Sequence, residues 1–460
     1  MSDGGEARTV AVIGGGVAGL TAAYELSKRG HKVVLYEAAP GLGGQAGTFE
    51  VEGARLERFY HHLFMSDLDM LSLVPQLDIA DKMLWIKPRM GLFHAGQVHE
   101  FGTPRALLTF PHLGLPAKTR FALATLFLMK FNRYQLFEGT SAWEWLRKVV
   151  GRQAFDVVWG PMLEAKFAKY ARDASMVWFW GKIALRGASR SSGAEQLGYF
   201  NLSFQVLIDA FRSRLEAQGT EIRTSCPIQE VRPAEDGALT VQVEGEQRQY
   251  DQVVVAIHNR DFIRIVPSLP DSYVGQLKQI QYEGGSCLLL SLEHSLSPIY
   301  WMNISAPDMP FTAIVEHTNF MPPERYGGKH VVYLSRYLPP DDPLFTVSKE
   351  ELLSIYVPHL KKIQPAFDPS WIRESWLFRD SQAQPIINVG YKSLQPAFTT
   401  PIPNLYLTNT TQIYPEDRGT NYAVRLGRQV AALMLGKSGA TSYVPMIGTG
   451  SKPAPFVVPD

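Results

Sequence analysis

The feature that most restricts the fold of this chain is a glycine-rich turn near its N-terminus, Gly14-Gly15-Gly16-Val17-Ala18-Gly19, with glycine at the first, third and sixth places. An apolar run at residues 10–13 precedes this turn and is typical of a buried strand. Residues 17–29 have helical apolar spacing, and a second apolar run at 32–36 predicts another strand. Because the connections are short, the two strands are expected to be parallel neighbours joined by the helix.

Each glycine of this turn has a physical reason in a dinucleotide site. Gly14 allows the sharp turn from strand to helix, Gly16 lets the backbone approach a pyrophosphate, and Gly19 lets the helix pack against the strand. The backbone N–H groups of Val17 and Ala18 lie at the start of the helix, where they and the helix dipole favour an anion. The turn therefore predicts a nucleotide cofactor held at the helix N-terminus.

The residue expected to bind the ribose is Glu37. It ends the second predicted strand about twenty residues after the turn, where an acid accepts hydrogen bonds from a ribose diol. A carboxylate at this place argues against a 2′-phosphate. These features fit NAD as well as FAD.

Composition sets outer limits on function. The 460 residues suit two or three domains, and 45 Lys and Arg balance 44 Asp and Glu for a net charge of +1, which gives no electrostatic footprint for nucleic acid. Cys226 and Cys287 are too few for a disulfide framework or a zinc site. We expect a cytoplasmic protein with a small-molecule substrate, no nucleic-acid partner and no metal; the sequence does not indicate an oligomeric state.

The apolar segments leave one question about membranes open. Residues 2–6 do not resemble a secretory signal, and no uninterrupted apolar run is long enough to cross a bilayer. The richest apolar stretch, 121–129, covers about half a membrane span. It is interpreted either as a buried helix or as an apolar lip at a membrane or substrate entrance, so that peripheral membrane association is an alternative.

The stretch after Glu37 points to a flavin. Residues 38–48 read Ala-Ala-Pro-Gly-Leu-Gly-Gly-Gln-Ala-Gly-Thr, and this resembles the second glycine signature of the amine oxidase, protoporphyrinogen oxidase and phytoene desaturase superfamily of flavoproteins. The resemblance implies FAD as the cofactor, with contacts from Ala38, Gly43, Gly44 and Gln45. Paired glycines suit a site where a ligand meets bare backbone.

Two further stretches extend this resemblance. Residues 226–257 resemble the superfamily's β-meander and returning strand, which implies that backbone near Val231 meets the adenine side of FAD. Residues 405–425 resemble its closing flavin motif, which implies that Gly419, Thr420 and Asn421 lie at a helix start facing the flavin.

The sequence also departs from the superfamily pattern. Gln45 stands where arginine is usual, and Asn409-Thr410 stands in place of Gly-Asp, with Asp417 as a nearby substitute. The counterpart of the strand that carries a lysine beneath the flavin in amine oxidases, residues 286–292, has no lysine. This last departure argues against ordinary amine oxidation.

The expected architecture is α/β, an FAD-binding Rossmann-like (GR2-type) domain with an inserted α+β substrate domain. The FAD-binding domain is assigned to residues 1–80, 200–262 and 385–440, the substrate domain to 81–199 and 263–384, and an extended tail to 441–460. Residues 81–199 are predicted to be mostly helical, and strands are predicted at residues 286–292, 312–316 and 331–334.

Three residues are candidates for catalysis. The adjacent His61 and His62 are placed to act as acid or base, or to contact the flavin, and the alternative is that they pack and bond to backbone. Arg418 is a candidate to offset flavin charge or to bind an anionic substrate group. The polar cluster at residues 316–319 is interpreted as pocket lining or as a turn.

The leading functional hypothesis is an FAD-dependent oxidoreductase that dehydrogenates or desaturates a largely apolar, lipid- or isoprenoid-like molecule by hydride transfer to the flavin. The aromatic-rich segments 121–137 and 178–180 favour it. The alternative is a redox-neutral flavin-dependent mutase or isomerase that acts on a sugar nucleotide, for which Arg336, Arg379, Arg418 and Arg425 would be cationic pocket residues. A flavin-binding protein without catalysis is the third hypothesis.

Overall fold

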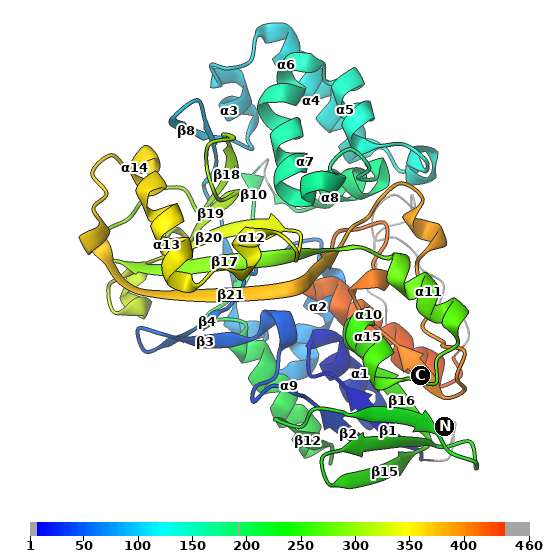
Figure 1. Cartoon of the computed structure of the whole chain (residues 1–460). Coiled ribbons are helices and arrows are strands. Elements are labelled where there is room, and N and C mark those ends of the chain that lie inside the picture. The colour runs from blue at the N-terminus through cyan, green and yellow to red at the C-terminus, as the bar shows by residue number, and fades with distance from the viewer. Residues whose placement is uncertain (1–6, 192–193, 438–460) are drawn as a thin grey trace.

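The computed structural model describes residues 7–191 and 194–437. The predicted tail at 441–460 and the N-terminal residues 2–6 lie outside this range. In Figure 1 a helical segment lies at the top, a large sheet crosses the middle, and a smaller parallel sheet lies at the bottom near the N-terminus.

The smaller sheet is parallel throughout, with five strands in the described part of the chain, in the order β12-β2-β1-β16-β22. The sequence near the N-terminus forms β1 (Thr9–Ile13), α1 (Val17–Ser27) and β2 (Lys32–Tyr36), as the glycine turn predicts. The other strands are β12 (Glu221–Arg223), β16 (Gln252–Val255) and β22 (Leu405–Leu407). Strands separated by hundreds of residues therefore end at one common edge.

The two faces of this sheet are covered differently because side chains alternate along each strand. Val10 and Val12 of β1 pack in a core with α1, α9 (Gln205–Ala217) and α15 (Thr420–Met434). Ala11 and Ile13 pack on the opposite face with α10 (Asn259–Ile265) and an antiparallel meander. The meander consists of β13 (Glu230–Pro233), β14 (Leu239–Val243) and β15 (Glu246–Tyr250).

The large sheet has the order β21-β17-β20-β19-β18-β7-β8 among the described residues, and its neighbours pair antiparallel apart from β18 and β7. Its strands are β21 (Ile372–Pro385), β17 (Tyr282–Leu292), β20 (His330–Leu338), β19 (Ala313–Glu316), β18 (Trp301–Ser305), β7 (Met90–His94) and β8 (Gln97–Glu100). Three short helices pack against it, α12 (Pro343–Thr346), α13 (Lys349–Tyr356) and α14 (Leu360–Ile363). The helix α11 (Asp271–Gln279) packs instead with α10 in the core of the parallel sheet.

The start of the segment expected to be helical is instead extended. Residues 83–100 contain β6 (Met83–Ile86), β7 and β8, and β6 pairs with β11 (Leu197–Phe200), which also pairs with β5 (Leu63–Phe64). The helical prediction was wrong here because short apolar runs do not distinguish helix from strand. The deciding partners, β11 and β18, lie more than a hundred residues further along the chain.

Residues 104–188 of this segment are mostly helical, as expected. They form α3 (Pro104–Thr109), α4 (Leu115–Lys130), α5 (Ala142–Val149), α6 (Arg152–Ala154), α7 (Gly160–Phe167) and α8 (Met176–Ala188). These helices share a core that contains the buried rings of Trp178 and Trp180. Within residues 7–191 and 194–437, none of the helices has both the length and the hydrophobicity needed to span a bilayer.

The predicted α/β class with a Rossmann-like parallel sheet is confirmed. The strands of the parallel sheet come from the segments assigned to the FAD-binding domain, and most of the large sheet comes from the other segments. The domain boundaries themselves stay a prediction.

Candidate functional site

A long cavity of about 440 Å³ follows the edge where the parallel strands end. Its wall includes the residues that come directly after β1, β2, β16 and β22, namely Gly14, Glu37, Ala256 and Thr408. Parallel strands place all their carboxyl ends at one edge, which is where such sheets bind ligands.

Glu37 lies in the wall of this cavity with a fixed carboxylate. The backbone N–H of Gly15 donates to its Oε2 at 2.7 Å, and the N–H of Ala39 donates to its Oε1 at 2.8 Å. The side chain is half-buried, and each oxygen keeps a further lone pair for another donor. This geometry fits the ribose diol of a dinucleotide.

The two glycine signatures meet in space beside Glu37. Gly16 forms a bridge with Gly43, and the N–H of Gly43 donates to the carbonyl of Gly15 at 2.8 Å. A Cβ on Gly16 would have only the Cα of Gly44 within 4 Å, at 3.8 Å, so bare backbone faces the cavity. A Cβ on Gly19 would lie 1.9 Å from the carbonyl oxygen of Gly14, which explains the close packing of helix on turn.

Most of the other residues that were predicted to contact the cofactor line the long cavity. Val17, Ala18, Ala38, Gly44 and Gln45 line the long cavity, as do Gly43, Gly419 and Thr420. The cradle runs from the acid at Glu37, past the start of α1, to the start of α15. These residues fit FAD.

Two of the predicted contacts do not line the cavity. The side chain of Val231 is fully buried against the sheet, and Cys226, Pro227 and Ile228 line the wall before it. Asn421 turns away, since its Oδ1 accepts the N–H of Met70 at 2.9 Å. The contacts of backbone near Val231 and of Asn421 with FAD therefore stay predictions, and their side chains do not form the cavity wall.

We expect Glu37→Ala to weaken FAD binding. Loss of charge-assisted hydrogen bonds to the ribose costs about 1.5–3 kcal/mol, which is about tenfold or more in the dissociation constant. Titration of apoprotein with FAD, followed by flavin fluorescence, measures this. Glu50→Ala, on the exposed side of β3 (Thr48–Val51), is the matched control. An unchanged dissociation constant for Glu37→Ala would place the ribose elsewhere.

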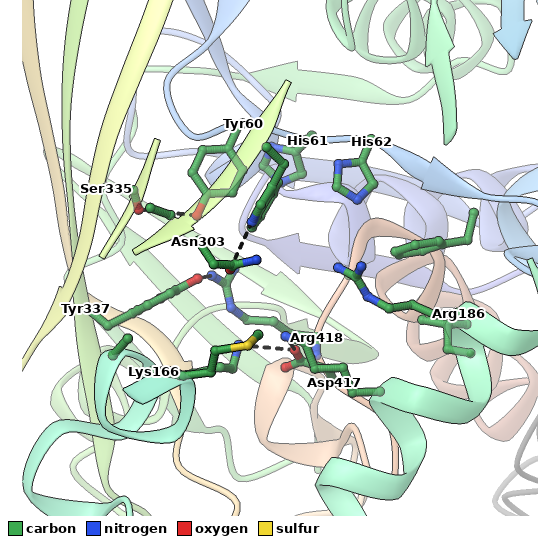
Figure 2. Close-up of a pocket in the computed structure, with 18 of the residues that line it drawn as sticks. Tyr60, His61, His62, Lys166, Arg186, Asn303, Ser335, Tyr337, Asp417 and Arg418 are labelled. Carbon is green, nitrogen blue, oxygen red and sulfur yellow. Dashed lines mark hydrogen bonds and ion pairs between the residues drawn. The ribbon is translucent and has the colours of Figure 1, made fainter. Parts of the chain in front are cut away.

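A second cavity, of about 230 Å³, meets the first one at His61, Arg418, Gly419 and Thr420. Much of its wall is aromatic or aliphatic: Tyr60, Phe64, Met162, Leu185, Trp301, Ile304, Tyr337 and Tyr422. Figure 2 shows His61 and His62 on one side of this cavity, facing Arg418 and Arg186. The second cavity therefore suits a substrate that reaches the cofactor at the point where the two cavities meet.

The two predicted catalytic histidines both line the second cavity. Burial lowers the pKa of His61 to about 4 and that of His62 to about 3, so both are neutral near pH 7. His61 Nδ1 lies 2.6 Å from the carbonyl of Phe59 and therefore donates to it, which leaves Nε2 as an acceptor. The imidazoles can accept hydrogen bonds at neutral pH but cannot act there as strong acids.

Arg418 joins the two cavities. Its Nη2 donates to the hydroxyl of Tyr337 at 2.8 Å, and its Nη1 lies 3.5 Å from Oε1 of Gln45. Gln45 is held by Asp380, whose Oδ2 accepts its amide at 2.8 Å. Arg418 thus brings a cation beside Gln45.

Asp417 does not replace the missing motif acid, because it lines only the second cavity. There its Oδ2 lies 3.1 Å from Lys166 Nζ and 3.6 Å from Lys182 Nζ. Burial opposes its ionisation, but the two lysines hold the pKa of Asp417 below its usual value. Lys166 and Lys182 were not predicted as site residues, since nothing in their spacing along the sequence distinguishes them from surface charges.

The cluster at residues 316–319 forms a buried turn. Glu316 accepts the N–H groups of Leu296 and Ser297 at 3.2 and 2.9 Å, and Asn319 donates to the carbonyl of Ser297 at 2.6 Å. None of these residues lines the two cavities. The turn interpretation of this segment therefore agrees with the structure.

A dinucleotide cradle with a second, flavin-type glycine signature in its wall defines a flavoprotein of the oxidoreductase class. The chain belongs to the family of flavin containing amine oxidoreductases, which matches residues 17–435. Membership confirms the predicted flavoprotein family and FAD as the cofactor.

Individual relatives are more distant. A carotenoid phi-ring synthase from Streptomyces griseus is 25% identical over 290 residues, 58% of this chain and 55% of that protein, so the match spans about half its length. A zeta-carotene desaturase from Zea mays is 36% identical over 85 residues, 18% of this chain and 15% of that protein. In fold, the chain resembles reduced UDP-galactopyranose mutase, with a TM-score of 0.73 and 14% identity over 95% of this chain and 98% of that one.

Proposed function

We propose that this protein catalyses the FAD-dependent dehydrogenation or desaturation of a largely apolar, lipid- or isoprenoid-like small molecule. The observation that carries this proposal is the junction of the two cavities, where an aromatic-lined space opens onto the end of the FAD cradle at His61 and Arg418. The relatives described as a zeta-carotene desaturase and a carotenoid phi-ring synthase support the same reaction class.

Bound FAD supplies the acceptor for the hydride that the substrate loses. The protein's residues then have three tasks. Tyr60 and Trp301, whose rings pack edge to face with centroids 4.7 Å apart, present an apolar wall that orients the substrate. His61 keeps an unprotonated Nε2 toward the cavity as a hydrogen-bond acceptor, and Arg418 places a permanent positive charge at the cofactor end.

Anaerobic mixing tests this function. Purified holoprotein is mixed without oxygen with phytoene, zeta-carotene and carboxylated polyenes in detergent, and flavin absorbance is followed. We expect at least one of these substrates to bleach the oxidised flavin and to gain a double bond. Product formation that requires prior dithionite reduction, without a net change in redox state, would contradict the proposal.

The second candidate function is the redox-neutral mutase or isomerase acting on a sugar nucleotide. The positive charge of Lys166, Lys182 and Arg186 in the second cavity favours it, because a diphosphate needs cationic partners. The aromatic and aliphatic side chains of the same wall favour the oxidoreductase instead. Conversion of a nucleotide sugar by dithionite-reduced protein, with no conversion by the oxidised form, would select the mutase.

We also propose that the protein contacts a membrane surface through α3, α4 and the loop after α4. Large apolar side chains here have between 47% and 73% of their surface exposed: Leu108, Leu115, Leu123, Leu126, Phe127 and Leu136. In α4, positions 115, 123, 126 and 127 share one helix face, opposite the buried Phe121, Ala124 and Leu128. An exposed apolar face of this kind marks an interaction surface.

Charge indicates a lipid surface as the partner. The sequence between Glu100 and Glu138 contains no Asp or Glu, and its basic residues are Arg105, Lys118, Arg120, Lys130 and Arg133. Apolar side chains among Lys and Arg are typical of elements that lie in the interface of an anionic membrane. A membrane position would also bring an apolar substrate close to the enzyme.

The Leu123→Gln/Leu126→Gln variant tests this contact. We expect the holoprotein to sediment with vesicles of phosphatidylglycerol and phosphatidylcholine, and the variant to lose about tenfold or more in vesicle affinity, since burial of each leucine is worth about 1.5 kcal/mol or more. Leu202→Gln, exposed elsewhere, is the control. Equal vesicle binding by the variant, or a change only in oligomeric state, would contradict a membrane contact.

A further inference from the structure

Three cationic side chains enter the second cavity from two helices. Lys182 and Arg186 are one turn apart on α8, so both lie on the face that borders the cavity, and Lys166 reaches it from α7. Lys166 and Lys182 lie on the ring of Trp178, each with Nζ 5.3 Å from its centroid. Figure 2 shows Arg186 directed into the cavity and Lys166 beside Asp417.

The carboxylates near these cations do not balance their charge. Asp417 is shared between Lys166 and Lys182, and Arg418 lies next to it in the chain. Glu195 lies 3.6 Å from Arg186. Asp67 also lines the cavity, but burial raises its pKa to about 7, so its negative charge is only partial near neutral pH.

This excess of positive charge is costly inside a protein unless an anion offsets it. Burial, reinforced by the charge of Lys166, lowers the pKa of Lys182 to about 7 despite the presence of Asp417. The side chain of Lys182 is only 29% exposed. Such a lysine gains a proton readily when a carboxylate or phosphate is placed beside it.

These cations are separate from the FAD cradle, because none of Lys166, Lys182 and Arg186 lines the long cavity. Apolar side chains, among them Phe64 and Leu185, share the same wall. We infer that Lys166, Lys182 and Arg186 form a subsite for a carboxylate or phosphate group carried by an otherwise apolar substrate.

This subsite narrows the substrate class of the proposed function, on which it rests. A plain hydrocarbon would leave the excess positive charge of this wall without a further anionic partner, whereas an acid or a phosphate ester with an apolar body would supply one. The anionic end anchors the molecule between α7 and α8. Its apolar body then extends along Tyr60 and Trp301 toward the junction with the FAD cradle.

Calorimetry on the oxidised, FAD-loaded protein tests the subsite without turnover. The probes are octanoate, octyl phosphate and neutral octanol, which share one chain length. We expect at least one of the anions to bind about tenfold or more tightly than octanol, as one or two charge-assisted hydrogen bonds require. The stronger of the two anions identifies the group as carboxylate or phosphate.

The variants Lys182→Met and Arg186→Met should each reduce this preference, and the double variant should abolish it. Lys169→Met, an exposed lysine one turn after Lys166, should keep it. FAD content and unfolding temperature identify the variants that are folded. If the double variant loses FAD, the anion preference is compared in the two single variants alone. Octanol binding as tightly as both anions, or an anion preference that survives in the variants, would overturn the inference.

The pH dependence gives an independent readout. The titratable and charged groups around Lys182 include Lys166, Arg186, Asp417, Tyr337 and His62. Since the anion binds the protonated amine, its affinity should be highest below pH 7 and fall as the pH rises through about 7. Lys182→Met should reduce this dependence to the part contributed by Asp67, which ionises over the same range. Flavin bleaching is measured separately. If the protein shows this anion preference but catalyses only redox-neutral chemistry, the proposed dehydrogenation is contradicted and the anion subsite is not.

Discussion

Gly16→Val is expected to yield a folded but colourless protein that does not bind FAD. The backbone at Gly16 forms the wall of the long cavity next to Gly43 and Gly44, and a Cβ there would point into open space where the pyrophosphate has to lie. A branched side chain would fill that space against the turn. The measurement is the ratio of flavin to protein absorbance after purification and after incubation with FAD.

The matched control is Gly41→Val. Gly41 lies in the same loop as the second glycine signature, is exposed, and has no atom within 4 Å of an added Cβ. We expect this variant to keep its flavin. Full flavin occupancy in Gly16→Val, with an unfolding temperature like that of the wild type, would show that the cofactor lies elsewhere.

Arg418→Met is expected to slow flavin reduction by substrate about a hundredfold or more. The guanidinium lies where both cavities meet, and removing a preorganised donor from such a place has effects of that size in other enzymes. Loss of the charge should also lower the two-electron midpoint potential of the flavin by about 30–60 mV, the equivalent of one charge-assisted hydrogen bond. Anaerobic stopped-flow reduction and a reductive titration measure the two effects.

Arg418→Lys separates charge from geometry at this position. Lysine keeps the positive charge but cannot bond simultaneously to Tyr337 and Gln45, as the guanidinium does. We expect the lysine variant to restore most of the potential and only part of the rate. A potential unchanged in Arg418→Met would mean that the charge acts on the substrate and not on the cofactor.

The dinucleotide cradle was predictable from sequence because its contacts are local. Gly14 to Gly19 form one turn between a strand and a helix, and Glu37 follows on the adjacent strand, so chain geometry alone brings these residues together. The second glycine signature was found by resemblance. Its contact with the first one, through Gly16 and Gly43, follows from the short connection between them.

The structure adds side-chain orientations and distant partners that the sequence did not predict. Val231 and Asn421 lie near the right elements, but their side chains point into the core and toward Met70. Asp417 was considered as a flavin-motif acid, and the structure turns it toward two lysines. In each case contacts with elements distant in the chain accompany the side-chain orientation, and sequence spacing does not encode these contacts.

By itself the sequence therefore determined the first strand-helix-strand unit and the glycine cradle, because hydrophobic periodicity and glycine turns act over short distances along the chain. The flavin class came from the resemblance of residues 38–48 to a known superfamily signature. The tertiary structure alone decided the chemistry of the second cavity. Lys166, Lys182 and Arg418 lie on separate elements, and packing of α7 and α8 against the loop before α15 brings their charges around one carboxylate, Asp417. The physical reason is that charge clusters of this kind arise from contacts between elements distant in the chain, which no local pattern of residues specifies.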